Sequence, residues 1–117
     1  MVCDDEKAIN HALELKLGHE NFSVVTASNG NQCLEAMGKD KFDLVLLDLV
    51  LPEKDGFEVL EELKKRGNKV PIIIISNLGQ EEDIQRVHSL GVSYYLIKSN
   101  TPLVEIVEKV KEVLGKK

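Results

Sequence analysis

The chain contains no tryptophan, and only 4% of its 117 residues are aromatic. We therefore expect a hydrophobic core built almost entirely from aliphatic side chains. Cysteine is scarce as well, because Cys3 and Cys33 are the only two, and their spacing fits neither a metal site nor a disulfide framework. Both lie next to apolar residues, which favours two small core residues. A reducing cytoplasm is the simplest compartment for such a chain.

Long apolar segments and nucleotide-binding loops are also missing. The longest hydrophobic run is far too short to span a bilayer, and charge begins at Asp4, which argues against a signal peptide. No glycine-rich phosphate loop occurs, so direct use of ATP is not expected. The net charge of −5 argues against nonspecific binding to nucleic acid or to anionic membranes. We expect a cytoplasmic protein that contacts neither.

The chain has the length of one domain, 1–117, and strand patterns alternate with helical patterns along it. Apolar runs predict strands at 1–3, 22–27, 42–48, 70–76 and 92–97. Amphipathic patterns predict helices at 5–17, 32–38, 56–65 and 80–90. A last helix is expected to open at Thr101 and Pro102, a capping residue followed by proline at the first helical position. Gly18 is the expected stop of the first helix.

Alternating strands and helices predict an α/β fold. The continuous apolar character of the third and fourth strands indicates a sheet that is covered on both faces. Right-handed crossovers then give a doubly wound five-stranded parallel sheet with five helices. For five strands we expect the common flavodoxin-like strand order 2-1-3-4-5. The first strand is shortened to residues 1–3, whereas a strand normally has about 5 residues. We expect that a few residues are missing before Val2.

Polar residues close four of the predicted strands. Asp4 and Asp5 follow the first strand, Asp48 the third, Ser76 the fourth and Lys98 the fifth. In an open parallel sheet these carboxyl ends meet at one edge, which is where ligand sites lie. Three carboxylates, a hydroxyl and an ammonium suit a divalent cation and a phosphoryl group. The sequence therefore predicts such a site at this edge.

Each of these residues, taken alone, also has a simpler interpretation. Asp4 and Asp5 can cap a helix and supply its acidic first turn. Asp48 can accept hydrogen bonds from loop amides, and Ser76 can cap the helix that follows it. Lys98 can be a solvated residue at a strand end. These alternatives stay open residue by residue, and the ordered placement of all five at strand ends is what favours a common site.

The segment 42–56, Phe-Asp-Leu-Val-Leu-Leu-Asp-Leu-Val-Leu-Pro-Glu-Lys-Asp-Gly, resembles the phosphoacceptor strand and loop of receiver domains in bacterial two-component response regulators. The resemblance extends from Val2 to about Leu114. It is carried by an ordered set of residues: Asp4, Asp5, Asp48, Ser76, Tyr95 and Lys98. The chain therefore resembles a single receiver domain, of the chemotaxis-regulator-like kind.

The resemblance implies a role for each matching residue. Asp48 would be the phosphoacceptor, because a carboxylate can act as a nucleophile and form an aspartyl phosphate. Ser76 and Lys98 would contact the phosphoryl group, and Ser76 and Tyr95 would form the switch. A half-buried strand tyrosine is the simpler interpretation of Tyr95. The Mg²⁺ cofactor would be held by four groups: the carboxylates of Asp4, Asp5 and Asp48, and the backbone carbonyl of Val50.

The sequence departs from the receiver pattern at several positions besides its short first strand. Ser99 replaces the proline that usually follows the lysine, and we expect a trans peptide bond and an altered loop there. Asn77 stands where a small residue is common, which is expected to narrow phosphoryl access. Val50 offers no polar side chain to an attacking water, which favours a long-lived phosphoryl group.

These features predict a phosphoprotein that acts as a signalling switch in a two-component phosphorelay. Its partners would be a histidine kinase or phosphotransfer protein, and a downstream protein bound by the face of the fourth helix, fifth strand and fifth helix. A homodimer is left open. The chain would not be an enzyme, beyond catalysing its own phosphorylation and dephosphorylation. The alternatives are a structural or engineered pseudo-receiver without switching, and a Mg²⁺-dependent phosphatase or phosphotransferase that uses Asp48. The apolar Val50 counts against the last.

Overall fold

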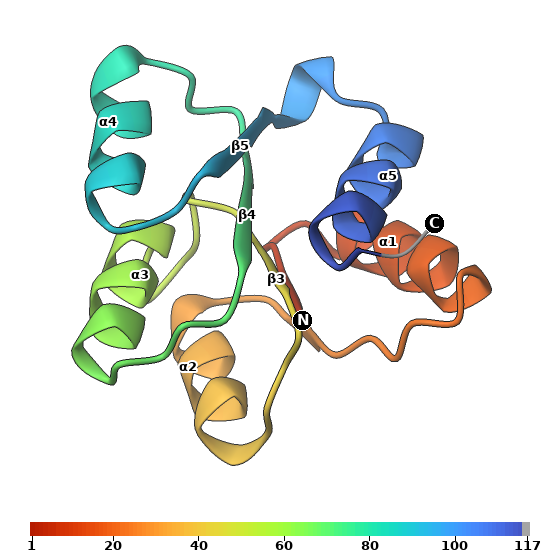
Figure 1. Ribbon diagram of the computed structural model, residues 1–117, viewed down its shortest axis with the longest axis horizontal. Coiled ribbons are helices and arrows are strands. Elements are labelled where there is room, and N and C mark those ends of the chain that lie inside the picture. The colour runs from red at the N-terminus through yellow and green to blue at the C-terminus, as the bar shows by residue number, and fades with distance from the viewer. Residues whose placement is uncertain (116–117) are drawn as a thin grey trace.

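The apolar runs of the chain pair side by side as a parallel sheet in a computed structural model, which describes residues 1–115 (Figure 1). The strand order is β2-β1-β3-β4-β5, as predicted. The strands are β1 Val2–Cys3, β2 Thr26–Ala27, β3 Val45–Leu47, β4 Ile72–Ser76 and β5 Tyr94–Ile97. The helices are α1 Lys7–His19, α2 Gly30–Lys39, α3 Gly56–Lys65, α4 Glu81–Ser89 and α5 Leu103–Val113, and a 3-10 turn, Lys98–Asn100, follows β5.

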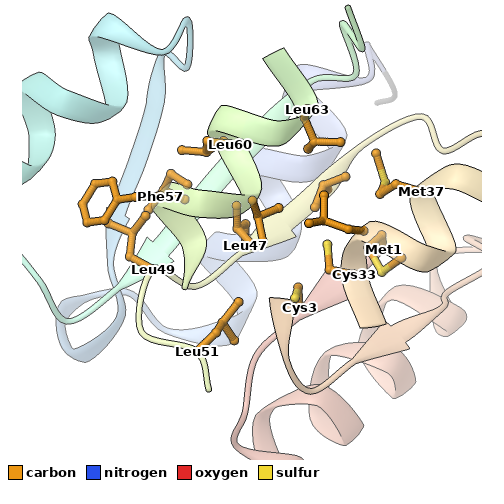
Figure 2. Close-up of a cluster of buried hydrophobic side chains, with 14 of the residues drawn as sticks. Met1, Cys3, Cys33, Met37, Leu47, Leu49, Leu51, Phe57, Leu60 and Leu63 are labelled. Atoms are coloured by element: carbon orange, nitrogen blue, oxygen red, sulfur yellow. The ribbon is translucent and has the colours of Figure 1, made fainter. Parts of the chain in front are cut away.

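The alternation of side chains along the strands divides the core between the two faces of the sheet. Val45, Leu47 and Ile74 pack with buried residues of α2, α3 and α4 (Figure 2). Leu46 and Ile73 point the other way and pack with α1 and α5. Figure 1 shows these two groups of helices on opposite sides of the sheet. The predicted doubly wound α/β fold is confirmed.

The two cysteines lie in the core beside the α2 helix (Figure 2). Both are buried and neither forms a disulfide, as predicted. A hydrogen bond to Cys33, together with burial, raises the pKa of the Cys3 thiol above its usual range. Cys3 therefore stays protonated, and a protonated thiol is a poor nucleophile.

The strands are shorter than predicted. The predicted strand 22–27 is limited to Thr26 and Ala27, because its only neighbour is β1, whose two residues pair with these two. The predicted strand 42–48 is likewise limited to Val45–Leu47. A strand ends where its hydrogen-bonded partner ends, and hydropathy alone does not reveal that point.

Two predicted helix signals are wrong. Gly18 lies inside α1, and the chain turns instead at Asn21, whose φ of 68° is in the left-handed region that asparagine tolerates. Thr101 does not cap α5, because its hydroxyl donates to the backbone oxygen of Ile97 at 2.8 Å. Pro102 is the residue before α5 rather than its first residue. Among the described residues 1–115, no helix is long and apolar enough to cross a membrane.

Gly56 brings the start of α3 against the end of β3. Its N–H donates to the backbone oxygen of Leu49 at 2.9 Å. A Cβ at this position would lie 2.5 Å from the backbone oxygen of Asp48 and 2.6 Å from the Cα of Leu49. A capping box of Asp55 and Glu58 fixes the same first turn of α3. The absence of a side chain at Gly56 therefore determines how closely α3 holds the segment that carries Asp48.

We predict that Gly56→Ala lowers the free energy of unfolding by about 1–3 kcal/mol, because the new methyl group displaces the backbone at Asp48. Gly18→Ala is the matched control. A Cβ at Gly18 meets no atom within 4 Å, and alanine raises helix propensity there, by about 1 kcal/mol at most. Urea unfolding of the three proteins checks both values. Equal or greater stability of Gly56→Ala would contradict the close contact.

Candidate functional site

One ammonium group, on a side chain that is 11% exposed, joins the carboxyl ends of three strands. The Nζ of Lys98 lies 2.8 Å from Asp4 Oδ2 and 2.7 Å from Asp48 Oδ2. It also lies 3.3 Å from Glu6 Oε1, at the rim of the site. Asp4 is fully buried and Asp48 is only 3% exposed. Because a buried carboxylate is costly unless it is paired, Lys98 is the residue that makes both burials tolerable.

A third carboxylate completes the acidic cluster. Asp4, Asp5 and Asp48 each present one oxygen within 4.8 Å of the others, and Asp5 is exposed. The single ammonium of Lys98 cannot balance three carboxylates. Oxygen ligands, an unbalanced negative charge and one solvent-facing member suit Mg²⁺, which keeps several waters when it binds carboxylates. The donor set at this edge therefore fits the predicted cation.

The pKa values in the site reflect burial first and the neighbouring charges second. Burial raises the pKa of the Asp4 carboxyl above its usual range, and the charge of Asp48 raises it further, although Lys98 and the N–H of Glu6 oppose the shift. Burial by itself would lower the pKa of Lys98. Hydrogen bonds and charges from Asp4 and Asp48 outweigh burial and raise the pKa of Lys98, so its ammonium stays charged. A bound cation would therefore favour the charged form of Asp4.

Backbone groups hold the two buried carboxylates in place. Asp4 Oδ1 accepts the N–H of Glu6 at 2.9 Å, and Asp48 Oδ1 accepts the N–H of Val50 at 3.1 Å. Behind Asp4, the side-chain amide of Asn10 donates to the backbone oxygens of Asp4 at 2.6 Å and Ala27 at 3.2 Å. Asn10 was not predicted as part of the site. Its signal was a polar residue on the inward face of α1.

The two predicted switch residues both form hydrogen bonds with the backbone of Leu78. The N–H of Leu78 donates to Ser76 Oγ at 3.3 Å, and the backbone oxygen of Leu78 accepts the hydroxyl of Tyr95. Ser76 is fully buried, and Gln80 rather than Ser76 is the cap residue of α4. Burial, with the charges of Asp83 and Asp48, raises the pKa of Tyr95 to about 12, so its hydroxyl remains a donor. Movement at Ser76 can therefore reach Tyr95 through Leu78.

The structure brings Asp4, Asp5, Asp48 and Lys98 together at one point. It places Ser76 at the carboxyl end of β4, beside β3 in the sheet. Asp4 Oδ1 accepts the N–H of Glu6 just before α1. The cap residue of α1 is Glu6, however, and the first turn contains no acidic residue, so the simpler interpretation of Asp4 and Asp5 as a cap and an acidic first turn is wrong. The side chain of Val50 is 54% exposed. The functional roles of all these residues stay predictions.

We predict that Lys98→Met lowers the free energy of unfolding by about 3–5 kcal/mol in metal-free buffer, because two buried carboxylates lose their shared cation. Added Mg²⁺ should recover more stability in this variant than in the wild type. Lys39→Met is the control, since Lys39 pairs with Glu35 on the surface, where a salt bridge contributes at most about 1 kcal/mol. Thermal melts with and without Mg²⁺ test this. Similar losses in the two variants would show that Lys98 does not stabilise the site.

Sequence comparison identifies relatives over nearly the whole chain. The family model described as the response regulator receiver domain matches residues 1–111. A probable transcriptional regulator, ycf27 of Pyropia yezoensis, is 36% identical over 114 residues, which are 97% of this chain and 46% of that protein. The alkaline phosphatase synthesis transcriptional regulatory protein PhoP of Bacillus subtilis is 33% identical over 97% of this chain and 47% of its own length. The chain thus spans about half the length of these relatives.

Solved structures agree with the sequence relatives. The receiver domain of the Francisella response regulator 1452 superposes with a TM-score of 0.90 at 25% identity, covering 97% of this chain and 93% of that one. The response regulator TrrA of Thermotoga maritima, solved in complex with Mg²⁺ and BeF, has a TM-score of 0.82 at 30% identity, with 96% and 95% of the chains covered. The fold, the acidic edge and these relatives agree, and the chain belongs to the family of response regulator receiver domains.

Proposed function

We propose that this receiver domain accepts a phosphoryl group on Asp48 in a two-component phosphorelay and changes its affinity for a partner protein as a result. One observation carries the proposal most directly. The buried Asp48 carboxylate lies 2.7 Å from the Lys98 ammonium and beside two further carboxylates that suit a divalent cation. Such a site can bring an anionic phosphoryl group to a nucleophile of the same charge.

In the proposed reaction, a carboxylate oxygen of Asp48 attacks the phosphorus of a phosphohistidine on a kinase or phosphotransfer protein. A P–O bond forms while the P–N bond breaks, and the imidazole nitrogen keeps the electron pair and takes a proton. Lys98 then turns from the Asp48 carboxylate to a phosphoryl oxygen, and the Ser76 hydroxyl donates to another. The chain itself would catalyse nothing beyond its own phosphorylation and dephosphorylation.

The residues proposed to hold Mg²⁺ are Asp4, Asp5, Asp48 and the backbone carbonyl of Val50. When bound, Mg²⁺ would neutralise charge on the transferring phosphoryl group. The donor set supports this assignment, as does the relative TrrA, which was solved in complex with Mg²⁺ and BeF. Because Asp5 is the exposed member of the cluster, it is the ligand proposed to meet the cation first.

The proposed output surface is the face formed by α4, β5 and α5. Of the nine residues described for α4, only Val87 is buried, so this helix can shift at little cost in apolar contacts. Tyr94 on β5 is 36% exposed and Val104 on α5 is 60% exposed, which leaves apolar area for a partner or a second copy. The named relatives are transcriptional regulators. We therefore propose a cytoplasmic protein partner in signalling, without direct nucleic-acid contact by this domain.

The central prediction concerns Asp48. Incubation with acetyl phosphate and Mg²⁺ should add the mass of one phosphoryl group, and Asp48→Asn should abolish this gain because the nucleophilic carboxylate is lost. Asp5→Ala should abolish metal binding and phosphorylation together. Asp43→Asn is the control, since Asp43 is an exposed aspartate near the opposite end of β3. Intact-protein mass spectrometry gives the answer.

Two results would contradict the proposed function. The first is phosphorylation that survives in Asp48→Asn, and the second is a gain in mass that needs no Mg²⁺. A wild-type chain that never gains the phosphoryl mass would instead support the pseudo-receiver alternative.

The switch is tested at Tyr95. Tyr95→Phe removes the hydroxyl that donates to Leu78. It should leave phosphorylation of Asp48 intact, because that hydroxyl bonds a backbone oxygen and not a carboxylate of the acidic cluster. The response of α4 to fluoroberyllate should shrink, since movement at Leu78 no longer reaches Tyr95. Amide chemical shifts of α4 with and without fluoroberyllate measure this response, and Tyr94→Phe on the exposed side is the control. Unchanged α4 responses in Tyr95→Phe would exclude this coupling.

A further inference from the structure

Two residues that depart from the receiver pattern contact each other. The side-chain oxygen Oδ1 of Asn77 accepts the backbone N–H of Ser99 at 2.8 Å. A proline at position 99 has no N–H to donate. Among small residues, glycine and alanine at position 77 would offer no side-chain acceptor. The bond therefore requires both departures at once, because Ser99 supplies the donor and Asn77 supplies the acceptor.

This bond joins the two loops that carry the phosphoryl-contacting residues. Asn77 directly follows Ser76 at the end of β4, and Ser99 directly follows Lys98 at the end of β5. The other side of Lys98 is also held, because the hydroxyl of Thr101 donates to the backbone oxygen of Ile97 at 2.8 Å. The peptide that carries Lys98 is thus fastened immediately before and immediately after the lysine.

The same bond adds to the ordering of the loop after β4. Ser76 Oγ accepts the N–H of Leu78, and the backbone oxygen of Leu78 accepts the hydroxyl of Tyr95. With the bond from Asn77 to Ser99, each of the three residues 76–78 is tied to a neighbour, and two of these ties reach β5 or the turn that follows it. The backbone conformation of 98–100 then depends on the loop after β4. No cis peptide bond occurs among residues 1–115, so the Lys98–Ser99 bond is trans, as expected from the missing proline.

We propose that Asn77 is a positioning residue that, through the N–H of Ser99, holds the Lys98 ammonium in place over Asp4 and Asp48. Asn77 itself touches neither carboxylate in this arrangement. Its effect on phosphoryl transfer rests on the proposed function, whereas its effect on Lys98 does not. The proposal replaces the expectation that Asn77 narrows access of the phosphoryl group to the site. The two ideas predict opposite changes in the phosphorylation rate of Asn77→Ala, slower for a positioning role and faster for narrowed access.

The bond is tested first by amide hydrogen exchange at Ser99. Asn77→Ala should speed exchange of the Ser99 N–H by about threefold to tenfold, which corresponds to the loss of one net hydrogen bond. Asn77→Asp keeps an acceptor oxygen and should keep the Ser99 N–H protected. Unchanged exchange in Asn77→Ala would overturn the proposal at its first step.

The link to Lys98 is tested by a double-mutant cycle in urea unfolding, which needs no phosphoryl group. Asn77→Ala should raise the unfolding equilibrium constant by about threefold to tenfold in the wild type, and by clearly less in the Lys98→Met background. Asn68→Ala is the matched control. Asn68 Oδ1 also accepts a backbone N–H, from Val70 at 3.0 Å, but this bond precedes β4, at the amino ends of the strands. The change in the unfolding constant caused by Asn68→Ala should therefore be the same in both backgrounds. Equal effects of Asn77→Ala in both backgrounds would overturn the link.

The consequence for phosphorylation is tested with acetyl phosphate at saturating Mg²⁺. Asn77→Ala should slow the wild-type rate by about threefold to tenfold, and Asn68→Ala should leave it unchanged. Ser99→Pro removes the donor of the same bond, so the double variant Asn77→Ala/Ser99→Pro should be no slower than the slower single variant. A faster Asn77→Ala variant would overturn the positioning role and support narrowed access. A wild type that gains no phosphoryl group would refute the proposed function, and the exchange and unfolding results would still decide the role of Asn77.

Discussion

The arrangement of the site depends on the ion pairs of one lysine. Lys98 comes from the end of β5 and reaches past β4 to carboxylates at the ends of β1 and β3. The long, flexible side chain of lysine suits this reach, and its compact charge pairs with both carboxylates at the same time. The strand order 2-1-3-4-5 is what places Asp4 and Asp48 side by side, and Lys98 is what allows both to be buried. Fold and site therefore constrain each other through this one contact.

The pairing also supports the proposal that the resting site binds a divalent cation. A single ammonium between two buried carboxylates leaves Asp5 without compensation, and the pKa of Asp4 is raised despite the neighbouring lysine. The charge is balanced well enough for the chain to fold around it. The remaining negative charge is the reason that we propose a divalent ion there, bound weakly in the resting state and more tightly once an anion is added.

Much of this was predictable from the sequence, because an apolar run that ends in a polar residue reports both a strand and the end at which its ligand groups lie. Asp48 and Lys98 were found in this way. The alternation of strands and helices, with right-handed crossovers, predicted the doubly wound sheet, and the strand order was expected from the flavodoxin-like arrangement common for five strands. Strand limits were not predictable, since they depend on how far a neighbouring strand extends. Leu78 was not predicted, because it acts through its backbone groups and residue type does not reveal them. Asn10 was missed although a polar residue on the inward face of α1 was a signal, because its two partners are backbone oxygens. Thr101 was wrongly predicted to cap the last helix, because a hydroxyl near a helix start has several possible backbone partners and here donates to Ile97.

The sparse attachment of α4 has a consequence for how stability is distributed over the domain. Polar contacts replace much of the missing apolar anchorage: Arg86 stacks over Phe57 at 4.2 Å and pairs with Glu61 at 3.0 Å, and both members of that pair are about half exposed. Exposed charge pairs are screened by salt, with a Debye length of about 8 Å at physiological ionic strength. Helix α4 is therefore the element whose local opening should respond most to the ionic composition of the medium, while the isoleucine strand beside it should not respond. In this domain, the surface proposed to bind the partner is therefore also the one whose local stability should fall as the salt concentration rises.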